Sequence, residues 1–463
     1  MASIDYAIVL GYFVFLIVAG LVKRSGDDTS AESFIVGSRR LTLPAFVASL
    51  VSTWYGGILG VGEYSYLYGL SNWLVFGVPY YLAALIFAFF IAERARKSEV
   101  LTIPDQLNIA YGKPSASVGS VILFIMAVPA AYVLMAGAIV EVIFGLPLWV
   151  GVIAGTVFSL VYVHFGGFNS VIRTDILQFG LMFVGFGVIL ATAYVGYGGF
   201  DFLVESLPDS HFTWHGGNSG WYIAVWYVIA LQTLIEPTFY QRCYAVKKTS
   251  DARKGIFISI LFWFVFDAMT TTTGLYARAI LPDLSNPVTS YPALAELILP
   301  IGLLGLFMTS LMATVMSTID SYAFVAASTY GRDIVWRMFG VPENRITLHT
   351  RIGLLLTGVL AVAIALFLGS VIDIWHHFGS VGTPALLVPL LSAHIGKRRM
   401  SPSVTFVSML LSGGISLIWL LSSYISADSS YWLGIQPIFP GLAVSVLFYL
   451  LCAKDTAKVS NIN

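Results

Sequence analysis

Residues 42–68 read TLPAFVASLVSTWYGGILGVGEYSYLY, and Glu63 is the only acidic or basic residue in this stretch. A helix of about 20 mostly apolar residues crosses a lipid bilayer, so the stretch is long enough to span a membrane. Four glycines fall within residues 56–62. Glycine weakens a helix because it loses the most conformational freedom when it is ordered. The sequence therefore predicts a membrane-spanning helix that is interrupted near its middle.

The composition of the whole chain also indicates a membrane protein. The 463 residues are 58% hydrophobic and only 10% charged, whereas about 25% of the residues are charged in soluble domains. A soluble fold could not cover its surface with so few charges, so we expect the lipid bilayer to surround much of the exterior. The 24 basic and 24 acidic residues balance, which gives no indication of a nucleic-acid partner. Cys243 and Cys452 lie too far apart in sequence to suggest a disulfide framework or a metal motif.

Apolar stretches long enough to span a membrane recur along the chain. The expected spans are 4–22, 42–68, 73–92, 117–143, 148–165, 174–198, 220–240, 255–281, 299–330, 352–371, 375–394, 403–424 and 436–453. The first span carries Asp5 where a secretory signal would carry positive charge, so we expect it to be retained as a helix. Thirteen spans place the two termini on opposite sides of the membrane.

The distribution of Lys and Arg predicts the orientation, because cytoplasmic loops are enriched in these residues. With the N-terminus outside, the inner loops receive 23 of the 24 basic residues, and only Arg278 lies outside. The inner set includes Lys23, Arg24, Arg242 and Lys458. We therefore expect one multi-pass transmembrane domain, residues 1–463, in the plasma (inner) membrane with a cytoplasmic C-terminus. No soluble module and no obligatory protein partner is evident.

Several acidic side chains fall inside the expected spans, where an ionised group is costly and therefore a functional candidate. They are Glu63, Glu141, Asp175, Glu236, Asp267 and Asp320, with Asp373 as a further candidate. Glu141 and Asp373 are expected near the outer ends of their spans. No Lys or Arg is expected at mid-depth to neutralise them, and unpaired acids of this kind indicate a cation pathway. The alternative is that each acid forms only local hydrogen bonds to neighbouring helices.

A second interruption is expected at Glu236-Pro237, because proline lacks a backbone donor. Interrupted helices at corresponding places in two halves of a chain indicate the central binding site of a transporter. Their free carbonyls can coordinate Na⁺, and their free N–H groups can receive an anionic group. For Gly56 and Gly60 the alternative is close packing of helices at small residues.

The span at 299–330 contains Ser317-Thr318-Ile319-Asp320-Ser321. Ser317, Asp320 and Ser321 lie at i, i+3 and i+4, so they share one face of a helix. Hydroxyl and carboxylate oxygens are the ligands that a hard cation prefers. Alternatively, Ser and Thr in such a helix bond back to its own carbonyls.

Three motifs together resemble those of the sodium:solute symporter family, which includes sodium–sugar, sodium–proline and sialic acid symporters. They are GGFNSVIRTDILQ at 166–178, Gln241-Arg242 followed by Ala245, Lys247 and Gly255, and Ser317 to Ser321 running on to Asp333-Ile334. The resemblance implies an all-α polytopic membrane fold of about 13 transmembrane helices around a leucine-transporter-type core of five-plus-five inverted repeats. The repeats would be 42–198 and 220–394, with an extra helix at 4–22 and two more at 403–453.

The same resemblance implies where ions bind. A sodium site would lie between the spans at 42–68 and 299–330. Its ligands would be the carbonyl groups of Leu50, Thr53 and Thr314 and the hydroxyl groups of Ser317 and Thr318. A second cation site, for Na⁺ or a proton, would comprise Asp175, Asp320 and Ser321.

The solute site implied by the resemblance lies across four spans, and its candidates are Trp54, Tyr55, Gly57, Gln232, Glu236, Asp267, His376 and His377. The two histidines are adjacent in sequence, so we expect at most one to face the site. The sequence lacks the lysine of the sugar symporters in the eighth span and has Ser52 in place of the aspartate of the proline symporters. With two acids and no base nearby, a zwitterionic, cationic or neutral polar solute is favoured.

We therefore expect a secondary active transporter, not an enzyme, which takes up a small polar organic solute together with Na⁺ by alternating access. One alternative is proton-coupled transport on the same fold, with Asp175 or Asp320 carrying the proton. Another is a receptor that binds a solute without transporting it. His211 and His215 are four residues apart and could share a metal only if that stretch were helical.

Overall fold

The computed structural model describes residues 1–21, 30–426 and 430–455. Lys23, Arg24 and Lys458, which were counted among the inner basic residues, lie outside this range. The described chain is almost entirely helical, and its only named strands, β1 (Arg398–Arg399) and β2 (Lys454–Asp455), pair antiparallel. Ten of its helices are long and apolar enough to cross a membrane. The prediction of an all-α polytopic membrane protein is thus confirmed.

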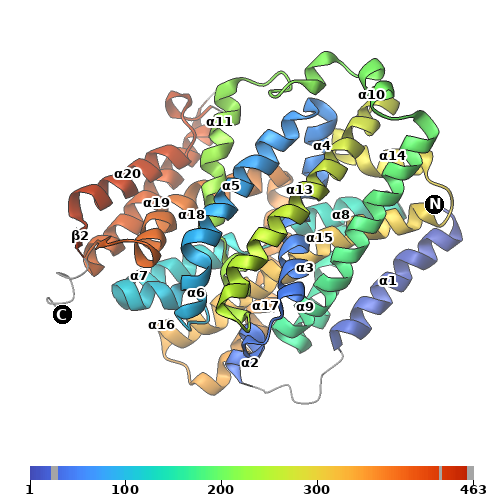
Figure 1. Ribbon diagram of the computed structural model, residues 1–463. Helices are drawn as coiled ribbons and strands as arrows, with labels where there is room; N and C mark the ends of the chain where they lie inside the picture. The colour runs from blue at the N-terminus through green and yellow to red at the C-terminus, as the bar shows by residue number, and fades with distance from the viewer. Residues whose placement is uncertain (22–29, 427–429, 456–463) are drawn as a thin grey trace.

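The elements follow one another without a separate globular unit (Figure 1). The first ten α-helices are α1 (Ser3–Leu21), α2 (Ala31–Val36), α3 (Leu43–Trp54), α4 (Ile58–Tyr68), α5 (Val78–Phe87), α6 (Glu93–Lys97), α7 (Ile103–Met126), α8 (Ala130–Phe144), α9 (Leu148–Tyr197) and α10 (Phe200–Ser206). The others are α11 (Gly220–Ile229), α12 (Pro237–Ala245), α13 (Thr249–Ile280), α14 (Ser290–Ile298), α15 (Leu303–Ser328), α16 (Arg337–Phe339), α17 (Ile346–Leu368), α18 (Val371–His394), α19 (Pro402–Ile425) and α20 (Ile438–Cys452).

Short 3₁₀ and π segments connect or interrupt these helices. They are η1 (Gly37–Arg39), η2 (Tyr55–Gly57), η3 (Trp73–Gly77), η4 (Ala88–Ala92), η5 (Asp209–Phe212), η6 (Ala230–Ile235), η7 (Pro287–Thr289), η8 (Thr329–Trp336), η9 (Glu343–Arg345) and η10 (Trp432–Gly434). Figure 1 shows α10 at one end of the bundle and α2 and α16 at the other, which we call the α10 end and the α2 end.

Two of the expected spans, 148–165 and 174–198, belong to the single long element α9. At about 1.5 Å per residue, 50 helical residues are far longer than a bilayer is thick. The helix therefore needs a bend, which occurs at Gly167, where φ is 58°. A side chain there would also meet the ring of Phe34 at 2.7 Å. The expected span 117–143 likewise crosses the junction between α7 and α8 rather than matching one helix.

The two predicted interruptions are confirmed. The helix of residues 43–68 is divided by the 3₁₀ turn η2, which contains Gly56 and Gly57. In the second half, η6 leads to Glu236, whose backbone is extended, and α12 begins at Pro237. Two helix interruptions, at η2 and at Glu236, are therefore available to build a site.

Helix α15 is the central helix of the bundle, and every residue from Phe307 to Ser328 is buried. It packs against α1, α3, α8, α9 and α17. The N-terminus of α15 meets the carboxylate of Asp5, which accepts hydrogen bonds from the backbone N–H of Gly302 at 2.7 Å and of Gly305 at 2.9 Å. A negative charge is stabilising at this end of a helix, so Asp5 anchors α1 to the central helix.

The α2 end is held together by a polar network. The start of α7 contributes Asp105, which pairs with Arg332 at 3.2 Å and also with Arg337. Thr102 donates to Asp333 at 2.8 Å. Arg39, just beyond α2, donates to the backbone carbonyl of Glu99 at 2.6 Å. These contacts join α7, the η8–α16 segment and the region of α2 into one closed surface.

Replacing Asp5 by alanine should lower the stability of the protein, because two buried N–H groups at the start of α15 would lose their acceptor. An unsatisfied buried donor costs about 1–3 kcal/mol. A clear drop in the melting temperature of detergent-purified protein is expected. The exposed Asp201→Ala in α10 is the matched control and should melt like the wild type. An equal melting temperature for Asp5→Ala would contradict the anchoring role.

Candidate functional site

A cavity of about 550 Å³ lies beside both helix interruptions. Seven of the eight residues predicted to bind solute line it: Trp54, Tyr55, Gly57, Gln232, Glu236, Asp267 and His376. His377 does not line it and instead has its Nε2 3.5 Å from the hydroxyl of Tyr424. The lining continues to Ser219 and Trp221, at the start of α11. The cavity therefore extends from the breaks towards the α10 end.

The breaks position the cavity residues. Trp54 ends α3, and Tyr55 and Gly57 lie in η2, so the interruption presents these residues to the cavity. Glu236 is the N-cap of α12, and its carboxylate accepts a hydrogen bond from the backbone N–H of Thr238 at 3.3 Å. The extended residue before the proline thus holds a carboxylate at the cavity wall.

Asp267, near the middle of α13, is the second carboxylate of the wall. It accepts hydrogen bonds from the hydroxyl groups of Tyr55 in η2 and Tyr81 in α5. The hydroxyl of Tyr81 also accepts from the indole N–H of Trp73 at 3.2 Å. Sequence reasoning identified Asp267 and Tyr55 but missed Tyr81, because nothing in the pattern of residues 73–92 showed which side of that helix faces Asp267.

Aromatic rings form much of the cavity wall. One group surrounds Trp54, with ring centroids 5.7 Å from Tyr80 and 5.8 Å from Trp263. A second group surrounds Tyr132, with centroids 5.2 Å from Tyr322 and 6.0 Å from Trp375. Trp263 precedes Asp267 by four residues on α13, so helical spacing could have identified it as a member of the same face.

Four of the five expected sodium ligands, Thr53, Thr314, Ser317 and Thr318, meet where α3 lies against α15. The hydroxyl of Thr318 donates to the carbonyl of Thr53 at 2.7 Å, and that of Ser317 donates to the carbonyls of Ser52 at 2.8 Å and Thr314 at 3.0 Å. Leu50 lies buried about one turn earlier on α3. The cluster consists of neutral oxygens without water access, which suits a weakly acidic hard cation such as Na⁺.

Close approach of the two helices at this point depends on Gly56. A Cβ at Gly56 would lie 2.3 Å from the hydroxyl oxygen of Thr318, and one at Gly57 would lie 2.4 Å from the ring of Trp375. At these distances a Cβ at either position would clash with its neighbour. The glycines therefore allow η2 to lie directly against α15 on one side and α18 on the other.

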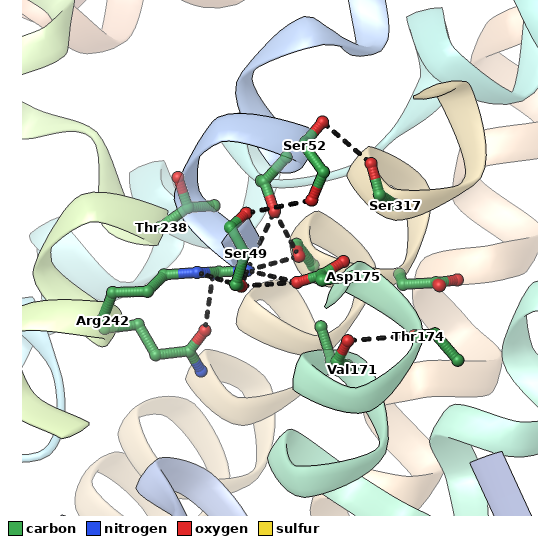
Figure 2. A network of polar contacts seen from close by, with 12 residues as sticks. Ser49, Ser52, Val171, Thr174, Asp175, Thr238, Arg242 and Ser317 are labelled. Carbon is green, nitrogen blue, oxygen red and sulfur yellow. Dashed lines mark hydrogen bonds and ion pairs between the residues drawn. The ribbon is translucent and has the colours of Figure 1, made fainter. Parts of the chain in front are cut away.

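Arg242 corrects one expectation. The sequence placed it in an inner loop and predicted no basic partner for the buried acids, but its side chain is fully buried. Its Nη2 donates to the hydroxyls of Ser321 at 2.6 Å and Thr53 at 3.0 Å, and lies 3.3 Å from Asp175. Figure 2 shows the guanidinium reaching Ser49 and Asp175. The expectation was wrong because hydropathy cannot tell which way a residue near a helix end points.

The residues of the expected second cation site are divided. Asp175 and Ser321 meet at the guanidinium of Arg242. Asp320 instead accepts hydrogen bonds from the hydroxyls of Ser159 and Tyr162 on α9. One positive charge of the protein itself therefore stands beside Asp175.

The two histidines of residues 199–219 have separate hydrogen-bond partners. His211 has its Nε2 3.0 Å from the carbonyl of Tyr66, while His215 accepts from the backbone N–H of Gly217 at 2.9 Å. Burial lowers the pKa of His211. Across the described residues, no group of three or more His, Cys, Asp or Glu side chains is arranged to hold a metal ion.

Two interrupted helices that face a central cavity, beside a cluster of neutral oxygens, define a secondary transporter of the leucine-transporter type. A sequence profile of the sodium:solute symporter family matches residues 34–411, and the chain belongs to this family. It is a transporter family, so the chain is not an enzyme.

Curated relatives cover almost the whole chain. The high-affinity choline transporter 1 of Drosophila melanogaster is 26% identical over 448 residues, which cover 89% of this chain and 71% of that protein. The osmoregulated proline transporter OpuE of Bacillus subtilis is 23% identical, with 98% and 96% covered. The sodium/pantothenate symporter of Escherichia coli is 23% identical, with 95% and 93% covered.

Solved structures have the same fold. A Na⁺-coupled sialic acid symporter superposes with a TM-score of 0.81 at 16% identity, covering 98% of this chain and 99% of that one. Mhp1, a nucleobase-cation-symport-1 family transporter, superposes with a TM-score of 0.58 at 11% identity, covering 93% and 96%. The expected leucine-transporter-type fold is thereby confirmed.

Breaking the buried pair of Arg242 and Asp175 should cost about 3–5 kcal/mol, because one charge is left without its partner. Arg242→Gln and Asp175→Asn should each lower the melting temperature, and the double variant should lose less than the sum of the two. The exposed pair Arg253–Glu93, at 3.1 Å, is the control and should contribute about 0–1 kcal/mol. Additive effects of the two buried changes would contradict a direct pairing.

Proposed function

We propose that the protein carries a small polar organic solute into the cell together with Na⁺ by alternating access. The observation that carries the proposal is that one helix interruption, between α3 and α4, contributes residues to both the oxygen cluster and the cavity. Thr53 offers its carbonyl to Thr318 in the oxygen cluster, and the next residues, Trp54 and Tyr55, line the cavity. An ion bound between α3 and α15 would therefore order the same turn that meets the solute.

This arrangement explains how Na⁺ would act on the solute. Na⁺ would take over the carbonyls of Thr53 and Thr314, which now accept from Thr318 and Ser317, and would hold α3 against the central helix. If it raises solute affinity by some factor, the solute raises Na⁺ affinity by the same factor. Each ion that enters at −100 mV adds about 2.3 kcal/mol of driving force.

Alternating access requires two openings. The cavity reaches the α10 end, while the α2 end is closed by the contacts of Asp105 with Arg332 and Arg337. In the proposed cycle these contacts break as the outer part of the cavity closes. We assign the movement to the repeats 42–198 and 220–394, which rock against each other around the two helix interruptions.

We propose one Na⁺ per cycle, bound by Leu50, Thr53, Thr314, Ser317 and Thr318. The guanidinium of Arg242 supports this number, since it already supplies positive charge to Asp175 at 3.3 Å. A second cation at Asp175 and Ser321 would stand beside a like charge in a medium of low dielectric constant, which is costly.

The relatives support the class of solute. They are named for choline, proline and pantothenate, and the sialic acid symporter is named for a sugar acid. All are small organic molecules. The acids Glu236 and Asp267 in the wall favour a cationic, zwitterionic or neutral member of this class.

Thr318→Ala should weaken binding of ²²Na⁺ to purified protein about tenfold, since one of five oxygen ligands is lost, equivalent to about 1.4 kcal/mol. The wild type should bind along a hyperbola that saturates at one ion per chain. Thr309→Ala is the matched control, because Thr309 lies on the same helix and its hydroxyl bonds only the carbonyl of Gly305.

Undiminished ²²Na⁺ binding by Thr318→Ala would remove the site from this position. Saturation at two ions would overturn the proposed stoichiometry. Uptake into proteoliposomes that is driven by a pH gradient without Na⁺ would favour the proton-coupled alternative.

We further propose that the N-terminus lies outside and the C-terminus lies in the cytoplasm of the plasma (inner) membrane. The bias of Lys and Arg towards the inner loops supports this orientation. A fluorescent protein fused after residue 463 should fluoresce in Escherichia coli, and alkaline phosphatase at the same place should be inactive. Active phosphatase with a dark fluorescent fusion would reverse the orientation.

A further inference from the structure

The charge of the cavity is negative and has no basic counterpart among the described lining residues. Glu236 and Asp267 are its two carboxylates, and each is only 3% exposed. The buried Arg242 is not in the lining and is engaged by Asp175, Ser321 and Thr53. The wall therefore offers two acids to whatever enters.

The two acids differ in how their negative charge is stabilised. Glu236 caps α12 and accepts from both the backbone N–H and the hydroxyl of Thr238, so the positive end of a helix stabilises it. Asp267 lies within α13, far from either end, and its partners are the neutral hydroxyls of Tyr55 and Tyr81. A buried charge without an opposite charge is costly. Asp267 is therefore the acid that lacks a cation.

The surroundings of Asp267 select the kind of cation. Tyr55 and Tyr81 bond the carboxylate itself, and Trp263 lies one turn away, with Trp54 at 5.8 Å between ring centroids. Aromatic faces attract cations that shed water easily, and quaternary ammonium groups above all. Na⁺ prefers oxygen ligands, which the cluster of α3 and α15 provides. An alkylated ammonium fits the aromatic wall better than a metal ion does.

Three buried donors of the lining have no hydrogen-bond partner in the described part of the chain. They are the hydroxyl of Thr233 and the indole N–H groups of Trp263 and Trp375, and the first two belong to the most deeply buried side chains. Thr233 is fully buried and Trp263 is 2% exposed. Buried donors are normally satisfied, so these two indicate an oxygen acceptor on the solute. Because the wall already holds two carboxylates, a neutral hydroxyl or carbonyl oxygen suits this place better than a third negative charge.

We propose that the solute is a small organic monocation, an alkylated ammonium compound that also carries a neutral oxygen acceptor. This inference rests on the proposed function, because it names the solute of the same cavity. The ammonium group lies beside Asp267 against the rings of Trp54 and Trp263. The oxygen atom accepts a hydrogen bond from Thr233 or Trp263.

Three probes of similar shape test the charge directly. Choline carries an ammonium and a hydroxyl, glycine betaine carries a carboxylate in place of the hydroxymethyl group, and 3,3-dimethyl-1-butanol is the neutral analogue of choline. In the presence of saturating Na⁺, choline should raise the melting temperature of purified protein at a concentration at least tenfold lower than either of the others. Equal potency of betaine or of the neutral analogue, or no effect of choline, would overturn the monocation.

A pair of matched variants tests the anchor. Asp267→Asn keeps the size and one of the two acceptor oxygens but removes the charge, and should weaken the choline effect at least tenfold. Glu63→Gln on α4 changes a half-buried acid outside the cavity lining and should leave it unaltered. An unchanged choline effect in Asp267→Asn would overturn the assignment of the anchor.

The Na⁺ response separates the two proposals. If ²²Na⁺ still binds and depends on Thr318 while no choline effect is seen, the monocation fails and the sodium site stands. If ²²Na⁺ binding is absent but choline binds through Asp267, the coupling ion fails and the solute class stands. Both readouts use the full chain in detergent.

Discussion

The contact between the turn at Gly56 and the side chain of Thr318 is the constraint on which the other features depend. No residue with a Cβ could bring the broken helix so close to α15. This approach sets the carbonyls of residues 52 and 53 within hydrogen-bonding distance of Ser317 and Thr318. The same turn directs Trp54 and Tyr55 into the cavity. The proposed ion site and the proposed solute site thus lie on two sides of one short piece of backbone.

Thr53 extends this connection to a third group. Its carbonyl faces Thr318, while its hydroxyl accepts from Arg242 and lies 2.9 Å from the hydroxyl of Ser321. Arg242 belongs to α12, which starts at the second helix interruption. The two interrupted helices are therefore joined through polar contacts as well as by facing one cavity. A movement of α12 would change the contact of Arg242 with Thr53, and through Thr53 it would change the oxygen cluster.

Much of this architecture could be predicted from the sequence because membrane helices obey simple rules. Apolar length predicted a bundle of membrane-spanning helices, although 148–165 and 174–198 belong to one element and 117–143 crosses a junction. The glycines of 56–62 and Pro237 located the helix interruptions. The candidates for the cavity came from the family resemblance, and seven of the eight line one cavity. Arg242, Tyr81, Trp263 and Thr233 were missed. Their positions depend on which face each helix turns inward, which hydropathy does not show. Of the four, only Trp263 could have been identified from helical spacing, because it precedes Asp267 by four residues.

The carboxylate of Asp105 takes part in several contacts at once. It bonds the backbone N–H groups at the start of α7 and pairs with Arg332 and Arg337. In the proposed cycle, the contacts with Arg332 and Arg337 are released before the α2 end opens. Weaker contacts would let that end open before the solute has arrived, and Na⁺ would then leak without solute. Stronger contacts would prevent leakage but slow each turnover. In that cycle, this single side chain would therefore set the balance between economy in the use of the ion gradient and speed of transport.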